Sequence, residues 1–284
     1  MIHQTFPMKQ TGSQDYARLI TFIHESSDEI GITRRPLVLI CPGGAYCYTS
    51  PREAEPIALA FANMGCHAAV LHYSVHPGAH YPVALTEVAA SVKLFRDHAE
   101  EWHIDRDKIL VLGFSAGGHL AASYGCFWKE PFVAEEVGAA DPEDLRPNGM
   151  ILGYPVITSG EFAHQGSIEA LLGDRYEELK EQMSLEKKVN ADFPPTFLWH
   201  TYADGSVPVE NSLLLVSALR KAGIPTEFHM FPDGGHGLSL ANETTVSVWG
   251  KEIQPQAETW IGLVRNWMKY HYPLTTEFRD DYPW

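Results

Sequence analysis

The chain has 284 residues, of which 45% are hydrophobic and 20% are charged, and its 36 acidic and 21 basic residues give a formal net charge of −15 at pH 7. This composition is ordinary for a globular protein, and the length suits one α/β core with a modest insertion. The acidic excess disfavours nucleic acids and anionic membranes as partners, because both are negatively charged.

The N-terminal stretch MIHQTFPMKQTGSQ has neither the basic start nor the apolar stretch of a secretory signal. No apolar run approaches the roughly 20 residues that cross a bilayer. The cysteines do not form a C-x-x-C motif; they are Cys41, Cys47, Cys66 and Cys126. We therefore expect a cytoplasmic protein with reduced thiols. No pattern indicates an oligomeric state.

Apolar runs typical of strands alternate along the chain with amphipathic runs typical of helices. The expected strands are 17–25, 36–44, 67–75, 108–115, 148–156, 195–204 and 227–235. Apolar residues three and four apart predict helices over 54–64, 85–95, 215–222 and 257–268. Continuous apolar strands between helices predict an α/β fold, with a mostly parallel, twisted sheet and helices on both faces.

Residues 157–194 interrupt this alternation, because they contain charged helical sequence such as DRYEELKEQMSLEKK and no strand. We interpret them as a small helical insertion within a single domain spanning 1–284. Right-handed crossovers place the C-terminal ends of parallel strands along one edge of the sheet, where ligands bind in such folds. The insertion is expected to lie over that edge; a solvated pair of surface helices is the alternative.

A serine lies between glycines in GFSAG, residues 113–117, at the end of the expected strand 108–115. The next residues, AGGHLAAS, can begin a helix. A nucleophile on a sharp strand-to-helix turn needs glycines two positions to either side, because side chains there would strike neighbouring backbone. The first N–H groups of the helix would face the serine. The motif favours Ser115 as a nucleophile over a mere packing turn.

The glycine-rich stretch CPGGAYCY lies at the end of the expected strand 36–44. An acyl-transfer enzyme needs N–H donors directed at the oxygen that becomes negatively charged. One is expected from the residue after the nucleophile, Ala116, and others from Gly44 and Ala45. An ordinary turn would explain the two adjacent glycines equally well.

An acid and a base follow later strands. Asp204 ends the expected strand 195–204, which puts it on the same edge as Ser115, although aspartates are also common at surface turns. Of the 14 histidines, His236 is the one in a glycine-lined loop late in the chain, in FPDGGHGLS. Other histidines have different contexts: His72 and His76 lie near a strand end, His119 in a helix, His200 within a strand, and His164 away from any expected loop at the edge.

Ser115, Asp204 and His236 occur in the order expected for an α/β-hydrolase, each after a strand. The segments PLVLICPGGAY, VLGFSAGGHLAAS and HTYADGSVPVENS resemble the small-esterase branch of that superfamily, which includes acetyl-xylan-esterase-like and feruloyl-esterase-like proteins. The resemblance covers most of residues 36–270. It departs from the hormone-sensitive-lipase-like branch, whose loop begins His-Gly-Gly-Gly, because Pro42 and Ala45 replace the first and last of those residues.

The resemblance implies that Ser115 is the nucleophile, Asp204 the orienting acid and His236 the base. It implies that Gly44, Ala45 and Ala116 donate to the oxyanion and that neither a metal nor a cofactor is needed. A second set of residues is expected to contact the substrate or to line its pocket: Tyr46, Tyr73 and His76. A structural role is the alternative for Tyr46.

The sequence therefore predicts a serine carboxylic-ester hydrolase that acts on short-chain acyl esters, with acetylated sugars favoured by the aromatic residues near the sheet edge. Its partner would be a small-molecule ester. Two alternatives stay open: an amide or peptide hydrolase of the same fold, such as a peptidase or formamidase, and a non-catalytic small-molecule binding protein on a hydrolase scaffold.

Overall fold

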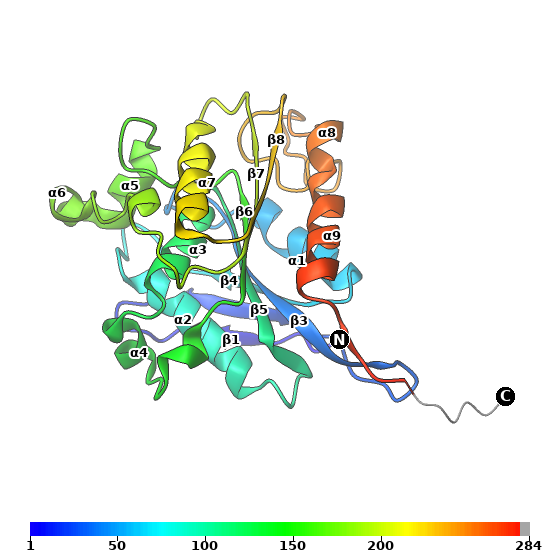
Figure 1. Ribbon diagram of the computed structural model, residues 1–284. Helices are drawn as coiled ribbons and strands as arrows, with labels where there is room; N and C mark the ends of the chain where they lie inside the picture. Colours follow the sequence, from blue (N-terminus) through cyan, green and yellow to red (C-terminus); the bar gives the residue numbers. More distant parts are fainter. Residues whose placement is uncertain (279–284) are drawn as a thin grey trace.

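The structure, a computed structural model that describes residues 1–278, is a twisted sheet covered by helices on both faces (Figure 1). Residues 279–284 of the expected single domain lie outside the described residues. The strands are β1 (Thr5–Pro7), β2 (Arg18–Phe22), β3 (Ile32–Cys41), β4 (His67–His72), β5 (Ile104–Phe114), β6 (Gly149–Gly153), β7 (Thr196–Thr201), β8 (Thr226–Phe231) and β9 (Thr275–Thr276).

From β3 to β8, each strand is followed by one or two α-helices. They are α1 (Glu55–Asn63), α2 (Val83–Asp97), α3 (Ser115–Phe127), α4 (Pro131–Val137), α5 (Gln165–Leu172), α6 (Tyr176–Leu179), α7 (Glu210–Ala222), α8 (Pro255–Glu258) and α9 (Trp260–His271). Short 3₁₀ turns lie at Pro51–Glu53, Pro142–Leu145, Gly173–Arg175 and Leu185–Lys187.

The strand order across the sheet is β1-β2-β4-β3-β5-β6-β7-β8, with β9 added to the start of β3. Within the run β4-β3-β5-β6-β7-β8, adjacent strands are parallel to each other, whereas β2 pairs antiparallel with both β1 and β4. The expected mostly parallel sheet is therefore a mixed sheet with a short antiparallel edge. The β1 and β9 strands were not predicted, because runs of three and two residues show no measurable periodicity.

The sheet separates two hydrophobic cores. Helices α1, α8 and α9 cover one face, and the buried residues there include Phe61 and Trp260. Helices α2, α3 and α7 cover the other, where Phe95 and Leu215 are among the fully buried side chains. Because each central strand is covered on both sides, both of its faces are apolar, which explains the continuous hydrophobic runs in the sequence.

The segment between β6 and β7 carries α5 and α6 and contains no strand, at the left of Figure 1 beside α7. Asn211 of α7 fastens its beginning: the side-chain carbonyl accepts from Ile157 N–H (2.9 Å) and Thr158 N–H (3.1 Å), and the amide donates to the Phe162 carbonyl (2.8 Å). The predicted insertion is therefore built from short helices and turns that are anchored to a core helix.

Two further findings concern the described residues only. Between residues 1 and 278, no helix is long and apolar enough to cross a bilayer. The four cysteines are free thiols, of which Cys47 is exposed and the other three are buried.

Candidate active site

Ser115 lies on a strained turn between β5 and α3. Its φ of 53° falls in the left-handed region, which residues other than glycine rarely occupy. The two flanking glycines are sterically required. A Cβ on Gly113 would lie 2.1 Å from the Gly117 carbonyl oxygen, and a Cβ on Gly117 would lie 2.1 Å from the Cys41 carbonyl oxygen. The GFSAG sequence therefore builds a turn that raises one serine from the end of a central strand.

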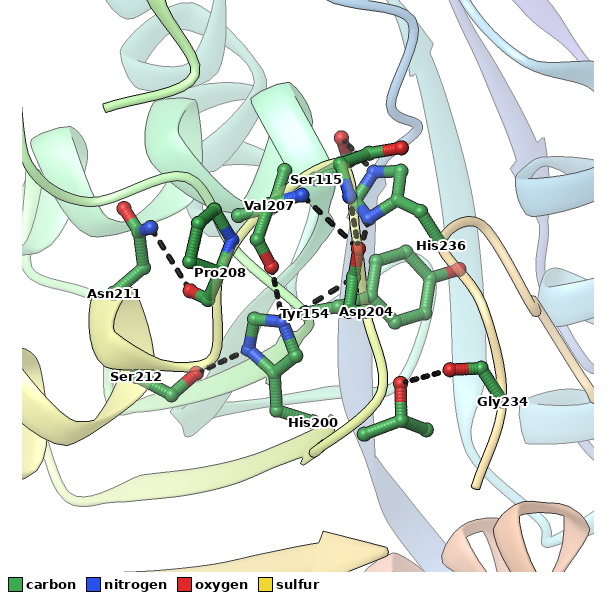
Figure 2. A network of polar contacts seen from close by, with 12 residues as sticks. Ser115, Tyr154, His200, Asp204, Val207, Pro208, Asn211, Ser212, Gly234 and His236 are labelled. Atoms are coloured by element: carbon green, nitrogen blue, oxygen red, sulfur yellow. Dashed lines mark hydrogen bonds and ion pairs between the residues drawn. The ribbon is translucent and has the colours of Figure 1, made fainter. Parts of the chain in front are cut away.

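Ser115, His236 and Asp204 form a continuous hydrogen-bonded chain (Figure 2). The Ser115 Oγ lies 2.7 Å from His236 Nε2, and His236 Nδ1 lies 2.7 Å from Asp204 Oδ2. Since a carboxylate only accepts, His236 Nδ1 carries a proton, and Nε2 of the neutral ring accepts the serine proton. In this geometry the Ser115 hydroxyl can donate its proton directly to His236 Nε2.

Asp204 is held by backbone as well as by His236. Its Oδ1 accepts from the N–H groups of Ser206 (2.9 Å) and Val207 (3.0 Å), which form the turn after β7. Burial alone would raise the pKa of Asp204, but hydrogen bonds from His200, His236 and Val207 N–H hold that pKa well below its usual range. The side chain is therefore a fixed anion beneath His236.

His236 belongs to the loop after β8, and two contacts fix that loop. Thr201 at the end of β7 donates its hydroxyl to the Gly234 carbonyl (2.9 Å), and the ring of Tyr154 packs against the His236 ring at a centroid distance of 5.1 Å. The loop is therefore tied to β7 on one side and packed against the end of β6 on the other.

The glycine-rich loop after β3 is supported from below by the buried carboxylate of Glu53. One oxygen accepts from Gly43 N–H (2.8 Å) and the other from the Tyr154 hydroxyl (2.7 Å), which itself accepts from Ser239 N–H (2.8 Å). Glu53 thus connects this loop to the segment that follows His236. Sequence reasoning missed Glu53, because nothing local distinguishes it from the exposed Glu55 two residues later.

The three predicted oxyanion donors belong to two segments that meet at Ser115, since a Cβ on Gly43, the residue before Gly44, would lie 2.9 Å from the Ser115 Cβ. Gly44 and Ala45 both have positive φ (135° and 54°), and Ala116 is fully buried in the first turn of α3. Among the described residues, no hydrogen-bond acceptor is found for the N–H groups of these three residues. Free N–H groups beside a serine suit a developing negative charge.

The residues predicted to line the substrate pocket differ in their surroundings. Tyr46 is buried, and its hydroxyl lies 2.9 Å from His119 Nδ1, which favours the structural alternative. Tyr73 and exposed His76 line a cavity of about 600 Å³ together with the exposed Tyr48. The Tyr73 side chain is itself fully buried and donates its hydroxyl to the Pro42 carbonyl (2.7 Å).

Two histidines that the sequence did not associate with the site lie close to it. His164, in the segment between β6 and β7, is half-buried, and burial together with the nearby positive charge of His236 lowers its pKa. His200, at the end of β7, contacts Asp204 directly: its Nε2 lies 3.3 Å from Asp204 Oδ2. A histidine four residues before the acid was the available signal, but its position inside an apolar strand concealed it.

Two other features of residues 1–278 bear on ligands. Their His, Cys, Asp and Glu side chains form no group of three or more that could hold a metal ion. A second cavity, of about 690 Å³, lies between α1 and β2, with Phe22, Leu59 and Val70 in its wall; none of the predicted site residues line it.

Comparison with known proteins gives the following similarities. Residues 27–219 match the BD-FAE family. The chain is 37% identical over 239 residues to endo-1,4-beta-xylanase B of Butyrivibrio fibrisolvens, covering 81% of this chain and 36% of that protein. It is 30% identical over 206 residues to the acetylxylan esterase of Xylanibacter ruminicola, covering 70% of this chain and 40% of that protein. The chain thus spans less than half the length of these curated relatives.

A solved structure matches over nearly the whole chain. A carboxylesterase from Lactobacillus plantarum superposes with a TM-score of 0.83 at 28% identity, covering 98% of this chain and 100% of that one. The similarity therefore extends over the mixed sheet, both helical layers and the segment between β6 and β7.

Proposed function

The chain belongs to the BD-FAE family of esterase-like α/β-hydrolases, and we propose on that premise that it hydrolyses short-chain carboxylic esters through an acyl-enzyme on Ser115. The predicted fold and family are confirmed. The esterases among its relatives support a carboxylic-ester hydrolase as the class of activity. The mechanism and the substrate are proposals from the site itself.

The observation that carries the mechanism is the chain of two 2.7 Å hydrogen bonds from Ser115 through His236 to Asp204. The Ser115 oxygen attacks the ester carbonyl while His236 takes its proton, and Asp204 stabilises the resulting imidazolium. His236 then gives the proton to the departing alcohol. A water molecule, deprotonated by His236 in the same way, releases the acid and restores the serine.

The free N–H groups around Ser115 supply the second requirement, which is stabilisation of the tetrahedral intermediate. Ala116 N–H lies at the start of α3, where the helix dipole adds positive potential. Gly44 and Ala45 contribute from the loop after β3, and Gly43 cannot do so because its N–H is already bonded to Glu53. Loss of one such donor typically lowers kcat by about 10²–10³.

Acetylated sugars are the favoured substrates. The cavity of about 600 Å³ beside the glycine-rich loop has the exposed Tyr48 ring and the exposed His76 imidazole in its wall. Aromatic faces and imidazole nitrogens suit the apolar faces and hydroxyl groups of a sugar ring. The xylan-related names of two relatives agree with this preference.

Ser115→Ala tests the mechanism. We expect loss of hydrolysis of 4-nitrophenyl acetate and loss of labelling by a fluorophosphonate, with an unchanged unfolding midpoint. Ser123→Ala is the matched control, since Ser123 is a buried serine further along α3 without a contact to His236 or Asp204. Hydrolysis by Ser115→Ala at the wild-type rate would refute the proposal.

A substrate panel tests the specificity. Acetylated xylo-oligosaccharides, feruloyl esters, 4-nitrophenyl acetate and an aminoacyl anilide should be compared by kcat/KM. The acetylated sugars are expected to give the highest value and the anilide the lowest. Faster cleavage of the anilide would instead favour the amide hydrolase, and the absence of both turnover and labelling would favour the binding protein.

A further inference from the structure

A second histidine contacts the acid of the Ser115–His236–Asp204 chain. His200 is fully buried at the end of β7, four residues before Asp204, and Figure 2 shows it reaching Asp204 from a different direction than His236. Its Nε2 lies 3.0 Å from the Val207 carbonyl oxygen and 3.3 Å from Asp204 Oδ2. Its Nδ1 lies 2.7 Å from the Ser212 hydroxyl in α7.

These contacts determine which ring nitrogen of His200 carries hydrogen. A carbonyl oxygen and an ionised carboxylate can only accept, so Nε2 must be protonated whether or not the ring is charged. That single N–H is shared between Val207 and Asp204. Ser212 fixes the ring from the other side, because its hydroxyl can donate to Nδ1 of a neutral ring or accept from a charged one.

We propose that His200 is a positioning residue for the proposed ester hydrolysis, in which its Nε2–H fixes Asp204 Oδ2 and draws negative charge from it. The inference rests on the proposed function, because it concerns the same acid and base. Asp204 Oδ2 receives N–H groups from both histidines, and Oδ1 receives backbone N–H groups from Ser206 and Val207. The carboxylate is therefore oriented by donors on both of its oxygens.

The proposal predicts how the pH dependence responds to loss of His200. Without that N–H, Asp204 holds more negative charge and stabilises the His236 imidazolium more strongly. If His200 is itself positive, its removal also ends a repulsion of the imidazolium, so both effects have the same sign. Three other titratable groups lie near His236 and Asp204, and the substitution leaves them in place: the Tyr154 phenol, whose ring packs on His236, the exposed Asp233 carboxylate in the His236 loop, and His164 in the segment between β6 and β7.

The test compares His200→Leu, which removes the donor, with His200→Gln, whose amide nitrogen carries two hydrogens for the same two acceptors. In His200→Leu, the acid limb of the kcat/KM profile should move upward by about half to one pH unit, as expected from loss of one hydrogen bond. Its plateau should fall about tenfold. The Gln variant should return the acid limb to the wild-type position.

His67→Leu and His67→Gln are the matched controls. His67 is also fully buried in a strand, but its ring bonds backbone at His24 and His103, near the start of β4. These variants should lose stability without moving the acid limb. If His200→Leu does not fold, Ser212→Ala takes its place: the ring loses its second support, and a smaller upward shift is expected.

An NMR titration of the His236 ring separates this proposal from the proposed function. Its midpoint should rise in His200→Leu and return in His200→Gln, whether or not the protein hydrolyses any ester tested. A wild-type protein without esterase activity would refute the proposed function alone. A folded His200→Leu variant whose acid limb and ring titration both match the wild type would overturn the role of His200.

Discussion

Two fully buried histidines lie under opposite sides of the candidate site and have almost the same hydrogen bonds. His200 lies under the acid, and His119 of α3 lies under the glycine-rich loop. In each ring, Nε2 lies 3.0 Å from a backbone carbonyl oxygen, and Nδ1 lies within 2.9 Å of a hydroxyl. The partners are Val207 and Ser212 for His200, and Met183 and Tyr46 for His119.

One contact separates them. His200 Nε2 also faces the Asp204 carboxylate, whereas the hydrogen-bond partners of His119 are uncharged. Burial therefore lowers the pKa of His119 to about 4, and the ring stays neutral and supports Tyr46 by packing and hydrogen bonding. Burial alone therefore does not assign a role to a histidine. The charge of its partners decides whether it can influence the chemistry.

The largest effect is expected on the acid side. Asp204→Asn replaces an acceptor with a group that cannot stabilise the imidazolium and that favours the wrong ring tautomer of His236, so kcat should fall by about 10⁴. Initial rates on 4-nitrophenyl acetate measure this. Asp233→Asn removes an exposed carboxylate from the His236 loop and should leave kcat within about twofold. Near-wild-type activity in Asp204→Asn would mean that the carboxylate is not needed to orient His236 or to stabilise its imidazolium.

A substitution that loosens the glycine-rich loop, which carries the proposed oxyanion donors Gly44 and Ala45, should lower the rate less than Asp204→Asn. Glu53→Gln places an amide NH₂ against either Gly43 N–H or the Tyr154 hydroxyl, both of which donate to Glu53, so the glycine-rich loop loses one support. Since the substitution removes none of the N–H groups proposed to bind the oxyanion, kcat should fall by about 10- to 100-fold, less than the usual loss when such a donor is deleted. Glu55→Gln, at an exposed position, is the control. An equal loss in both variants would argue against a specific role of Glu53.

His119 should influence stability rather than rate. Its folded pKa of about 4 lies below the unfolded value of about 6.5, so the unfolded state binds more protons between these values. Its contribution is complete above about pH 6.5 and declines as the pH falls toward 4. Urea unfolding measures this: between pH 7 and pH 5, the free energy of unfolding should fall by about 2 kcal/mol more in the wild type than in His119→Gln. An equal fall in the free energy of unfolding of both proteins would contradict the conclusion that the buried His119 ring is uncharged.

The smallest effect is expected at the mouth of the cavity. Tyr48 is 60% exposed in the glycine-rich loop, so Tyr48→Ala should raise KM for acetylated xylo-oligosaccharides about three- to tenfold with kcat unchanged, through loss of ring contact. Tyr270→Ala, which removes an 83% exposed tyrosine from α9, should change neither constant. A lower kcat in Tyr48→Ala would instead indicate that this ring positions the N–H donors.

Much of the fold could be predicted, because its signals are local. The seven expected strands correspond to β2 through β8, with ends that differ by a few residues, and the predicted helices correspond to α1, α2, α3, α7 and α9. Short elements such as β1, β9 and α4 were missed. Their formation depends on pairing or packing with distant segments, which leaves no periodic signal in so few residues.

Part of the candidate site could also be predicted from the sequence. Ser115, Asp204 and His236 were predicted as partners from their order and their positions after strands, and the structure brings them within hydrogen-bond distance. Glu53 and His164 were missed because their neighbours come from other strands and loops. Tyr46 was expected at the pocket. The positive φ angles of Ala45 and Tyr46 instead turn the loop so that the Tyr46 ring packs inward against His119.

Because backbone conformation depends largely on neighbouring residues, the amino-acid sequence was enough to predict the succession of strands and helices and the glycines that let Ser115 occupy a strained turn. Which buried polar side chains meet depended on how the strands and loops pack together. The sequence did not show that His200 and His119 differ, because a histidine within an apolar run gives no sign of which group its ring will contact. The register of β7 and the turn after it place the Asp204 carboxylate beside one ring and leave the other among uncharged groups.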